Sequence, residues 1–137
     1  MEKIGVSQKA IIFNGEGKFL TIRRTETAPS NPGKWDFPGG DLDFGEDAME
    51  GIIREIKEET GLDVEDLRPF DVESHINKEG DFWVTIAYIA KAISDKVILS
   101  CEHDEFRWLT AADFLKLGSS DKLRRFVGNW ATHWWCV

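Results

Sequence analysis

Residues 39–62 read GGDLDFGEDAMEGIIREIKEETGL, and this stretch decides the fold. A glycine-rich loop, residues 39–45, precedes an acidic segment, residues 46–60. Gly61 follows, and glycine is the residue type most often found just past a helix terminus. At 100° per residue the apolar side chains of the segment gather on one side, which predicts a helix packed against a core. The side chains expected to face that core are Met49, Ile52, Ile53 and Ile56.

The same helix carries a cluster of acidic residues away from the predicted core. Glu55, Glu58 and Glu59 stand at spacings i, i+3 and i+4, so their side chains converge on one patch. Crowded carboxylates repel one another, and a hard divalent cation such as Mg²⁺, which takes oxygen ligands, would remove that penalty. A plain solvated helix surface is the alternative for this cluster taken alone.

The spacing of the wider pattern separates these two interpretations. Gly40 is followed after five residues by Glu46, and after seven more by the run REIKEETGL, residues 54–62. Seven fixed letters at frequencies of about 0.07 each would coincide by chance at about one starting point in 10⁸. The pattern resembles the Nudix box at every specified position. The resemblance implies an enzyme that cuts a phosphoric anhydride in a nucleoside diphosphate derivative with Mg²⁺ or Mn²⁺.

The resemblance also assigns roles to residues of the box. It implies that Glu55 and Glu59 are the core metal ligands and that Glu58 is a third ligand or the base that deprotonates water. The carbonyl of Gly39 would add a ligand, because glycine permits close backbone approach. Both core ligands are expected on the helix face that carries no core residues.

Two further roles follow from the resemblance. Arg54 and Glu46 are expected to hold the loop to the helix and to orient the carboxylates. In MutT-like members a glutamate about six residues before a tryptophan can reach the metal or act as the base. Glu102 has that position relative to Trp108, with Glu105 as the fallback and a solvated acidic turn as the alternative.

Candidates for substrate binding lie outside the box. Arg23 and Arg24 end a predicted strand, and family members often use an arginine there to contact substrate. Adjacent strand residues point to opposite faces, so only one can face the site, and Arg24 is expected to be that one. Phe82 or Trp83 can stack on a base, with a core position as the alternative.

The C-terminal tryptophans and two histidines are not expected to belong to the site. Trp130, Trp134 and Trp135 would form a large exposed apolar patch on a monomer, so they are expected to dock on the core or on a partner, which suggests a homodimer. His75 and His103 are expected to be surface histidines.

The remaining elements predict an α/β (α+β) fold. Expected strands cover residues 6–13, 18–24, 67–76, 82–92 and 105–109, with a short extended piece at 35–38, and expected helices cover 111–117 and 120–130. The strand at 82–92 is expected to be buried on both faces. Strands interleaved with helices suggest a mixed sheet covered on both faces. That arrangement agrees with the αβα sandwich that the resemblance implies.

Composition narrows the class of protein. The 137 residues are expected to form one domain, 1–137, with 42% hydrophobic and 31% charged residues. The net charge of −8, with no basic run, argues against non-specific binding to nucleic acid. The first residues lack the apolar core of a signal peptide, and no apolar run is long enough to span a membrane. Cys101 and Cys136 have no metal or redox spacing, so reduced thiols in a cytoplasmic protein are expected.

The substrate prediction is made by elimination within the family. The proline expected of ADP-ribose hydrolases some fifteen residues past the box is missing at residues 76–78, and the tyrosine of diadenosine polyphosphate hydrolases is missing nearby, since Tyr88 is the single tyrosine. The signatures of NADH and coenzyme A hydrolases are absent too. The prediction is therefore a small MutT-like enzyme that splits (d)NTP into (d)NMP and pyrophosphate. The alternatives are another nucleoside diphosphate derivative (ADP-ribose or a nucleotide sugar) and a non-hydrolytic Nudix nucleotide-binding module, which usually loses box carboxylates.

Overall fold

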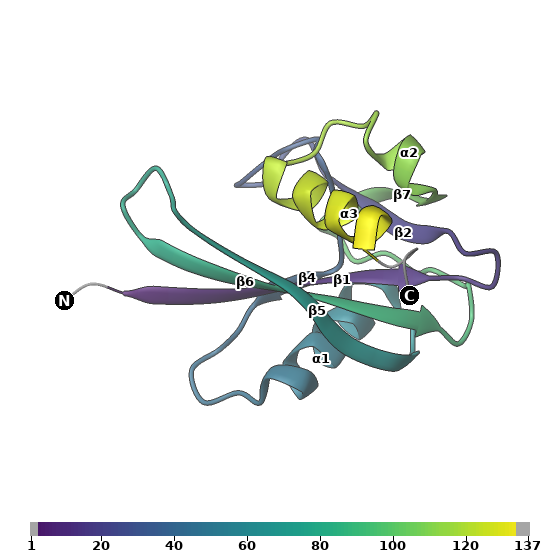
Figure 1. Cartoon of the computed structure of the whole chain (residues 1–137), viewed down its shortest axis with the longest axis horizontal. Helices are drawn as coiled ribbons and strands as arrows, with labels where there is room; N and C mark the ends of the chain where they lie inside the picture. The colour runs from purple at the N-terminus through teal and green to yellow at the C-terminus, as the bar shows by residue number, and fades with distance from the viewer. Residues whose placement is uncertain (1–2, 134–137) are drawn as a thin grey trace.

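Seven strands form one mixed sheet in the computed structural model, which describes residues 3–133 (Figure 1). The strands are β1 (Ile4–Phe13), β2 (Phe19–Arg24), β3 (Trp35–Asp36), β4 (Gly39–Asp41), β5 (Val64–Ile76), β6 (Phe82–Ala92) and β7 (His103–Leu109). The helices in the described range are α1 (Ala48–Thr60), α2 (Ala111–Phe114) and α3 (Asp121–His133). The α+β class predicted from the sequence is confirmed.

The sheet is organised around β1. Its main strand order is β3-β2-β1-β6-β5, while β4 pairs with β1 and β7 pairs with β2. β1 and β6 run parallel, and the other pairs are antiparallel. Helix α1 covers one face of the sheet, and α2 and α3 cover the other (Figure 1). This confirms the layered αβα arrangement with a mixed sheet.

Alternation along the central strands builds one core on each face. In β1, Ala10 and Ile12 pack with the α1 side, whereas Ile11 packs with the α3 side, because successive strand residues point to opposite faces. Residues 87–90 of β6 are all buried, so the prediction of burial on both faces is right for that half of the strand. The half that begins at Phe82 is more exposed.

Helix α1 ends as the sequence indicates but begins at Ala48, two residues after the expected start at residue 46. The Asp47 side chain accepts a hydrogen bond from the backbone N–H of Glu50 at 3.0 Å, and Gly61 ends the helix with φ 72°. Ile52 and Ile56 are fully buried.

The predicted core face of α1 is wrong at its margins. Met49 is 38% and Ile53 is 50% exposed, whereas Glu59, expected on a face without core residues, is only 8% exposed. The buried face is therefore rotated toward Glu59, because β4 passes against that side of the helix. The position of the sheet decides which side of the helix is covered. Helical periodicity alone carries no information about that position.

Several elements differ in length from the prediction. Pairing with β6 extends β1 back to Ile4 and β5 back to Val64, and pairing with Arg24 extends β7 back to His103. The helix expected over 111–117 ends at Phe114, and α3 continues past its expected end at residue 130 to His133. Backbone hydrogen bonds to neighbouring strands set the strand ends, and the local sequence shows them only weakly.

The C-terminal aromatic residues are partly accounted for. The Trp130 ring packs against Phe13 with ring centroids 4.9 Å apart, so this tryptophan docks on the core. Trp134, Trp135 and Cys136 lie outside the described residues. Cys101 is exposed and unpaired. None of the helices within residues 3–133 has the length and apolar character needed to cross a membrane.

Candidate active site

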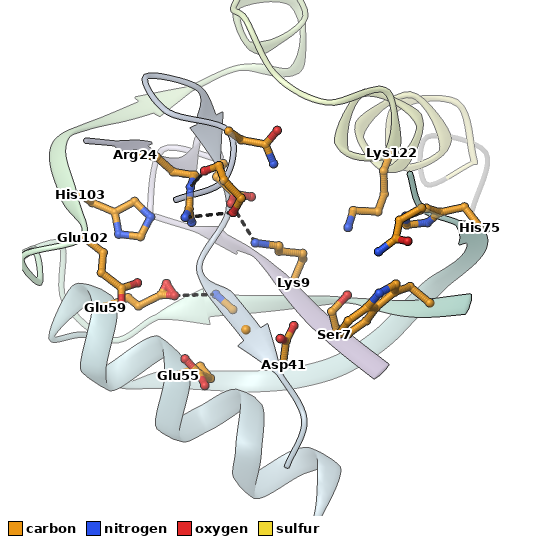
Figure 2. Close-up of a pocket in the computed structure, with 17 residues that line it drawn as sticks. Ser7, Lys9, Arg24, Asp41, Glu55, Glu59, His75, Glu102, His103 and Lys122 are labelled. Carbon is orange, nitrogen blue, oxygen red and sulfur yellow. Dashed lines mark hydrogen bonds and ion pairs between the residues drawn. The ribbon is translucent and has the colours of Figure 1, made fainter. Parts of the chain in front are cut away.

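A cavity of about 420 Å³ opens between α1, the central strands and the start of α3. Its lining is strongly charged: the carboxylates are Asp36, Asp41, Glu55, Glu59 and Glu102, and the lysines and arginine are Lys9, Arg24 and Lys122. Figure 2 shows Glu55, Glu59 and Glu102 toward the α1 side, with Arg24, Lys9 and Lys122 across the cavity from them. The cavity therefore has an acidic side, defined by these three glutamates, and a basic side, defined by these three cations.

Two glycines bring the backbone close to the acidic side. A Cβ on Gly40 would lie 2.8 Å from the carboxyl carbon of Glu55. A Cβ on Gly39 would lie 1.9 Å from the carbonyl oxygen of Gln8, and the Gly39 N–H donates to Glu59 Oε1 at 3.5 Å. A side chain at Gly40 would fill the space beside the Glu55 carboxylate, so Gly40 keeps that space open, whereas a side chain at Gly39 would collide with the β1 backbone.

Burial disfavours ionisation of Glu55 and Glu59 on the acidic side. The pKa of Glu59 is raised to about 8, chiefly by burial and further by the neighbouring carboxylates of Asp36 and Glu55, while Lys9 opposes the shift. Burial also raises the pKa of Glu55. Buried carboxylates that share one space are donors of the type that divalent cations prefer, and a bound cation would offset their repulsion.

The donor chemistry therefore fits a divalent metal. Within residues 3–133, no three His, Cys, Asp or Glu side chains are already drawn together around one point as metal ligands. The fit rests instead on the buried Glu59, the half-buried Glu55 and the space that Gly40 leaves beside Glu55.

Arg54 ties the glycine-rich loop to the helix. Its guanidinium donates to Glu46 at 2.9 and 3.1 Å and to both carboxylate oxygens of Glu58 at 3.2 Å, and it lies 3.2 Å from Glu55. The hydrogen bonds from Arg54 lower the pKa of Glu46. Arg54 and Glu46 thus make the contact that the sequence predicts for them. The side chain of Glu58 is 57% exposed, held by Arg54, and does not line the cavity.

Only one of the two strand-end arginines reaches the cavity. Arg24 lines it, whereas Arg23 points away and binds both Asp104, at 2.8 and 2.9 Å, and Glu26. The geometry agrees with the alternation argument that selected Arg24. Contact of Arg24 with a substrate stays a prediction.

Glu102 also lines the cavity, but two other candidates do not. Glu105 pairs with Arg107 at 3.1 Å, outside the lining. Phe82 is 38% exposed and lies on the opposite face of the sheet from its neighbour Trp83, which does line the cavity. Of the two aromatic candidates for base stacking, the geometry thus favours Trp83.

Histidines behave differently from the expectation. His103 is only 5% exposed, so the prediction of a surface position is wrong. Its Nδ1 has no hydrogen-bond partner among the described residues, and burial lowers its pKa. The side chain of His75 is exposed, as expected, and contacts Glu73 at 2.9 Å, although it also borders the cavity.

Two lysines of the basic side were not found by sequence reasoning. Lys9 donates to Asp36 at 2.9 Å, and Lys122 donates to Thr85 Oγ1 at 3.3 Å. A signal existed for Lys9, because it belongs to a polar triplet, residues 7–9, inside a strand that is otherwise largely apolar. Lys122 had no such signal, since a lysine near the start of a helix is ordinarily solvated.

Known proteins match this chain along most of its length. The NUDIX domain model matches residues 3–129. Nudix hydrolase 8 from Arabidopsis thaliana is 28% identical over 117 residues, which is 83% of this chain but 31% of the plant protein. RNA pyrophosphohydrolase from Roseobacter denitrificans is 28% identical over 127 residues, covering 77% of this chain and 76% of that protein. The chain thus spans less than a third of the plant relative.

Solved structures give a closer correspondence in length. The MutT protein from Methanosarcina mazei Go1 superposes with a TM-score of 0.81 at 30% identity, covering 95% of this chain and 94% of that one. An Ap4A hydrolase from C. elegans gives 0.77 at 25% identity, covering 97% and 99%. The chain therefore belongs to the Nudix family, as a MutT-like member.

Proposed function

We propose that this protein hydrolyses a (d)NTP to the (d)NMP and pyrophosphate, with Mg²⁺ as cofactor and Mn²⁺ as a possible substitute. Nudix proteins act on small nucleotide substrates and generally use a divalent metal. The observation that carries the proposal is that Glu55, Glu59 and Glu102 face the same cavity as Arg24. Carboxylates for a metal and a cation for phosphates thus border one space.

The acidic side is proposed to hold the metal. Glu55, Glu59 and the Gly39 carbonyl would be its ligands, with Glu58 as a candidate third ligand. A bound Mg²⁺ lowers the pKa of water and neutralises charge on phosphate oxygens. The Arg54–Glu46 pair would keep the carboxylates in orientation from behind.

The base that takes a proton from the attacking water is proposed to be Glu102 or Glu58. Glu102 borders the cavity, whereas Glu58 is turned onto Arg54. This arrangement supports Glu102, with Glu58 as the alternative. Arg24, on the opposite side, would hold a phosphate and help to orient the anhydride for attack.

A substrate panel tests the proposal most directly. Purified protein with Mg²⁺ would be assayed for phosphate or pyrophosphate release from (d)NTPs, ADP-ribose, nucleotide sugars, dinucleoside polyphosphates and a 5′-triphosphorylated oligonucleotide. The last two enter the panel because an Ap4A hydrolase and RNA pyrophosphohydrolases are among the similar proteins. We expect a triphosphate to have the highest kcat/KM. Preference for any other class over every triphosphate would refute the assignment.

The binding-module alternative is decided by the same assay. Tight nucleotide binding without turnover, across several divalent metals and at alkaline pH, would support a sensor in place of an enzyme. Retention of Glu55, Glu58 and Glu59 argues for turnover.

Assembly and location are proposals of a different kind. Three C-terminal tryptophans suggest a homodimer. However, Trp130 packs against Phe13 of the same chain, and the other two tryptophans lie outside the described residues. A monomer mass by light scattering at micromolar concentration would remove the dimer. A single domain over 1–137 and a cytoplasmic location also stay predictions.

A further inference from the structure

A second, smaller cavity of about 70 Å³ adjoins the basic side of the main cavity. The two cavities share Lys9, Arg24, Asn31, Asp36 and Lys122 in their linings, so they are neighbours. We call the smaller one the basic annex and define it by its charged lining: Lys9, Arg24, Lys34, Lys122 and Asp36. Four cations thus surround a space that has one carboxylate.

The single carboxylate of the annex is already occupied. Asp36 accepts a hydrogen bond from Lys9 Nζ at 2.9 Å and another from the Phe37 N–H at 2.7 Å. Although burial opposes ionisation, the Lys9 ammonium and these hydrogen bonds lower the pKa of Asp36. Asp36 therefore stays ionised and compensates Lys9, which leaves three cations without such a partner.

Those cations contact only neutral groups in the described part of the chain. Arg24 donates to the carbonyl oxygen of Ser30 at 2.7 Å and to its hydroxyl at 3.3 Å, and it forms no ion pair. Lys122 donates to the Thr85 hydroxyl at 3.3 Å, which in turn bonds to Ser7 at 2.7 Å. Lys34 likewise has no carboxylate within ion-pair distance among the described residues.

Of the three cations without a carboxylate partner, Lys122 indicates most clearly that an anion binds in the annex, because its side chain is half-buried. Burial, followed by repulsion from Lys9, lowers its pKa, and these two effects outweigh attraction to the carboxylates of Asp36, Glu73 and Asp41. A partly desolvated ammonium without a counter-ion costs stability, and a bound anion would supply that counter-ion. Figure 2 shows Lys122 extending from α3 into the same space that Lys9 enters from β1.

We propose that the basic annex binds the terminal phosphate of the substrate, at the end of the phosphate chain farthest from the acidic side. The proposal rests on the proposed function, because it assumes that the anhydride lies between the two sides. The annex is large enough to hold a phosphate but too small to hold a nucleobase. A diphosphate would leave the annex empty, so Lys122 would select triphosphates over diphosphates.

The first experiment compares Lys122→Gln with the parent for each NTP and its NDP. Gln keeps part of the side-chain length and removes the charge. We expect kcat/KM for the NTP to fall about tenfold, mainly through KM, while the value for the NDP changes less than about twofold. Lys34→Gln should act in the same direction but more weakly, since Lys34 is exposed. Lys122→Arg should restore much of the preference.

Arg125→Gln is the matched control, because Arg125 is an exposed cation on the same helix outside both cavities. It should change neither kinetic constant, and thermal melts should show every variant folded, with Lys122→Gln at least as stable as the parent because it removes a partly desolvated charge. An unchanged NTP-to-NDP ratio in Lys122→Gln would overturn the terminal-phosphate assignment.

The second experiment separates this proposal from the proposed function. Calorimetric titration of the metal-free protein with pyrophosphate and with inorganic phosphate needs no turnover. Weaker pyrophosphate binding in Lys122→Gln than in Arg125→Gln would support the annex even if no triphosphate were hydrolysed. Loss of inorganic phosphate binding alone, with the NTP-to-NDP ratio unchanged, would show a free-phosphate site and refute the substrate role. Equal binding of both anions by the two variants would refute the annex as an anion site.

Discussion

The two sides of the cavity are built in opposite ways. On the acidic side, Glu55 and Glu59 come from adjacent turns of α1, so one helix sets their separation. On the basic side, Lys9, Arg24 and Lys122 come from β1, β2 and α3. The α1 part of the acidic side is thus specified locally, whereas Glu102, just before β7, and the basic side are in place only when several elements are packed.

The largest expected effect tests the acidic side. Glu55→Gln and Glu59→Gln should each lower kcat by about a thousandfold, because Gln keeps the size of Glu but removes the charge that binds metal. The measurement is kcat against Mg²⁺ concentration. Glu50→Gln, exposed on the same helix, should stay near the parent value. If Glu59→Gln retained parental kcat at low Mg²⁺ while Glu50→Gln lost it, the site would have to be moved to the other face of α1.

Stability should respond to pH through Glu59. Its pKa rises from 4.5 in the unfolded chain to about 8 in the folded metal-free protein, so the folded state holds a proton that the unfolded state releases. The stability due to that proton is fully present below pH about 4.5 and is lost as pH rises through about 8. In EDTA, parental Tm should therefore fall across this window, whereas Glu59→Gln should fall less and be more stable at pH 8, by on the order of 3 kcal/mol.

Magnesium provides the check on that result. Added at pH 8, it should raise the Tm of the parent and have little effect on Glu59→Gln, because a ligand stabilises only the state that binds it. If the Tm of the two proteins changed equally with pH, with and without Mg²⁺, Glu59 would have neither a raised pKa nor a role as a metal ligand.

The next effect distinguishes the two candidate bases. If Glu102 takes the proton, Glu102→Gln should lower kcat by about a hundredfold and remove the acidic limb of the pH–rate profile. Glu58→Gln should then cost less, mainly by releasing Arg54. The reverse order of severity would return the base to α1, and this one helix would then supply both the metal ligands and the base.

The sequence predicted more of the acidic side than of the basic side, because the metal-ligand candidates lie on one helix and the cations lie on three separate elements. The end of α1 at Gly61 followed from residue type, the burial of Ile52 and Ile56 followed from local periodicity, and the spacing of the box identified the family. Met49 and Ile53 were misplaced, because the neighbouring β4 decides which helix face is covered. Lys122 and the buried His103 belong to segments that meet the site only through tertiary packing.

The smallest expected effect concerns the aromatic neighbours on β6. Phe82→Ala should change kcat/KM less than about twofold, because Phe82 lies outside the cavity lining. Trp83→Ala should cost more, since a stacked base is worth about 1–3 kcal/mol. Both variants need melting curves, because Trp83 packs against Gly5. Equal losses for the two would mean that neither ring stacks on the substrate.

The parallel pairing of β1 with β6 has a consequence for how the chain folds. Ser7 and Thr85, which pair across these strands, are 78 residues apart in sequence. Contacts of such long range form slowly, because the entropy of closing the loop must be lost before the pairing is gained. On a ribosome, β1 would be synthesised first and would have to wait for β6. During that interval, the edge of β1 that pairs with β6 would lack its partner, although α1 could already pack against β1 and β4. We therefore expect synthesis rate and chaperones, more than local helix propensity, to govern the yield of active protein.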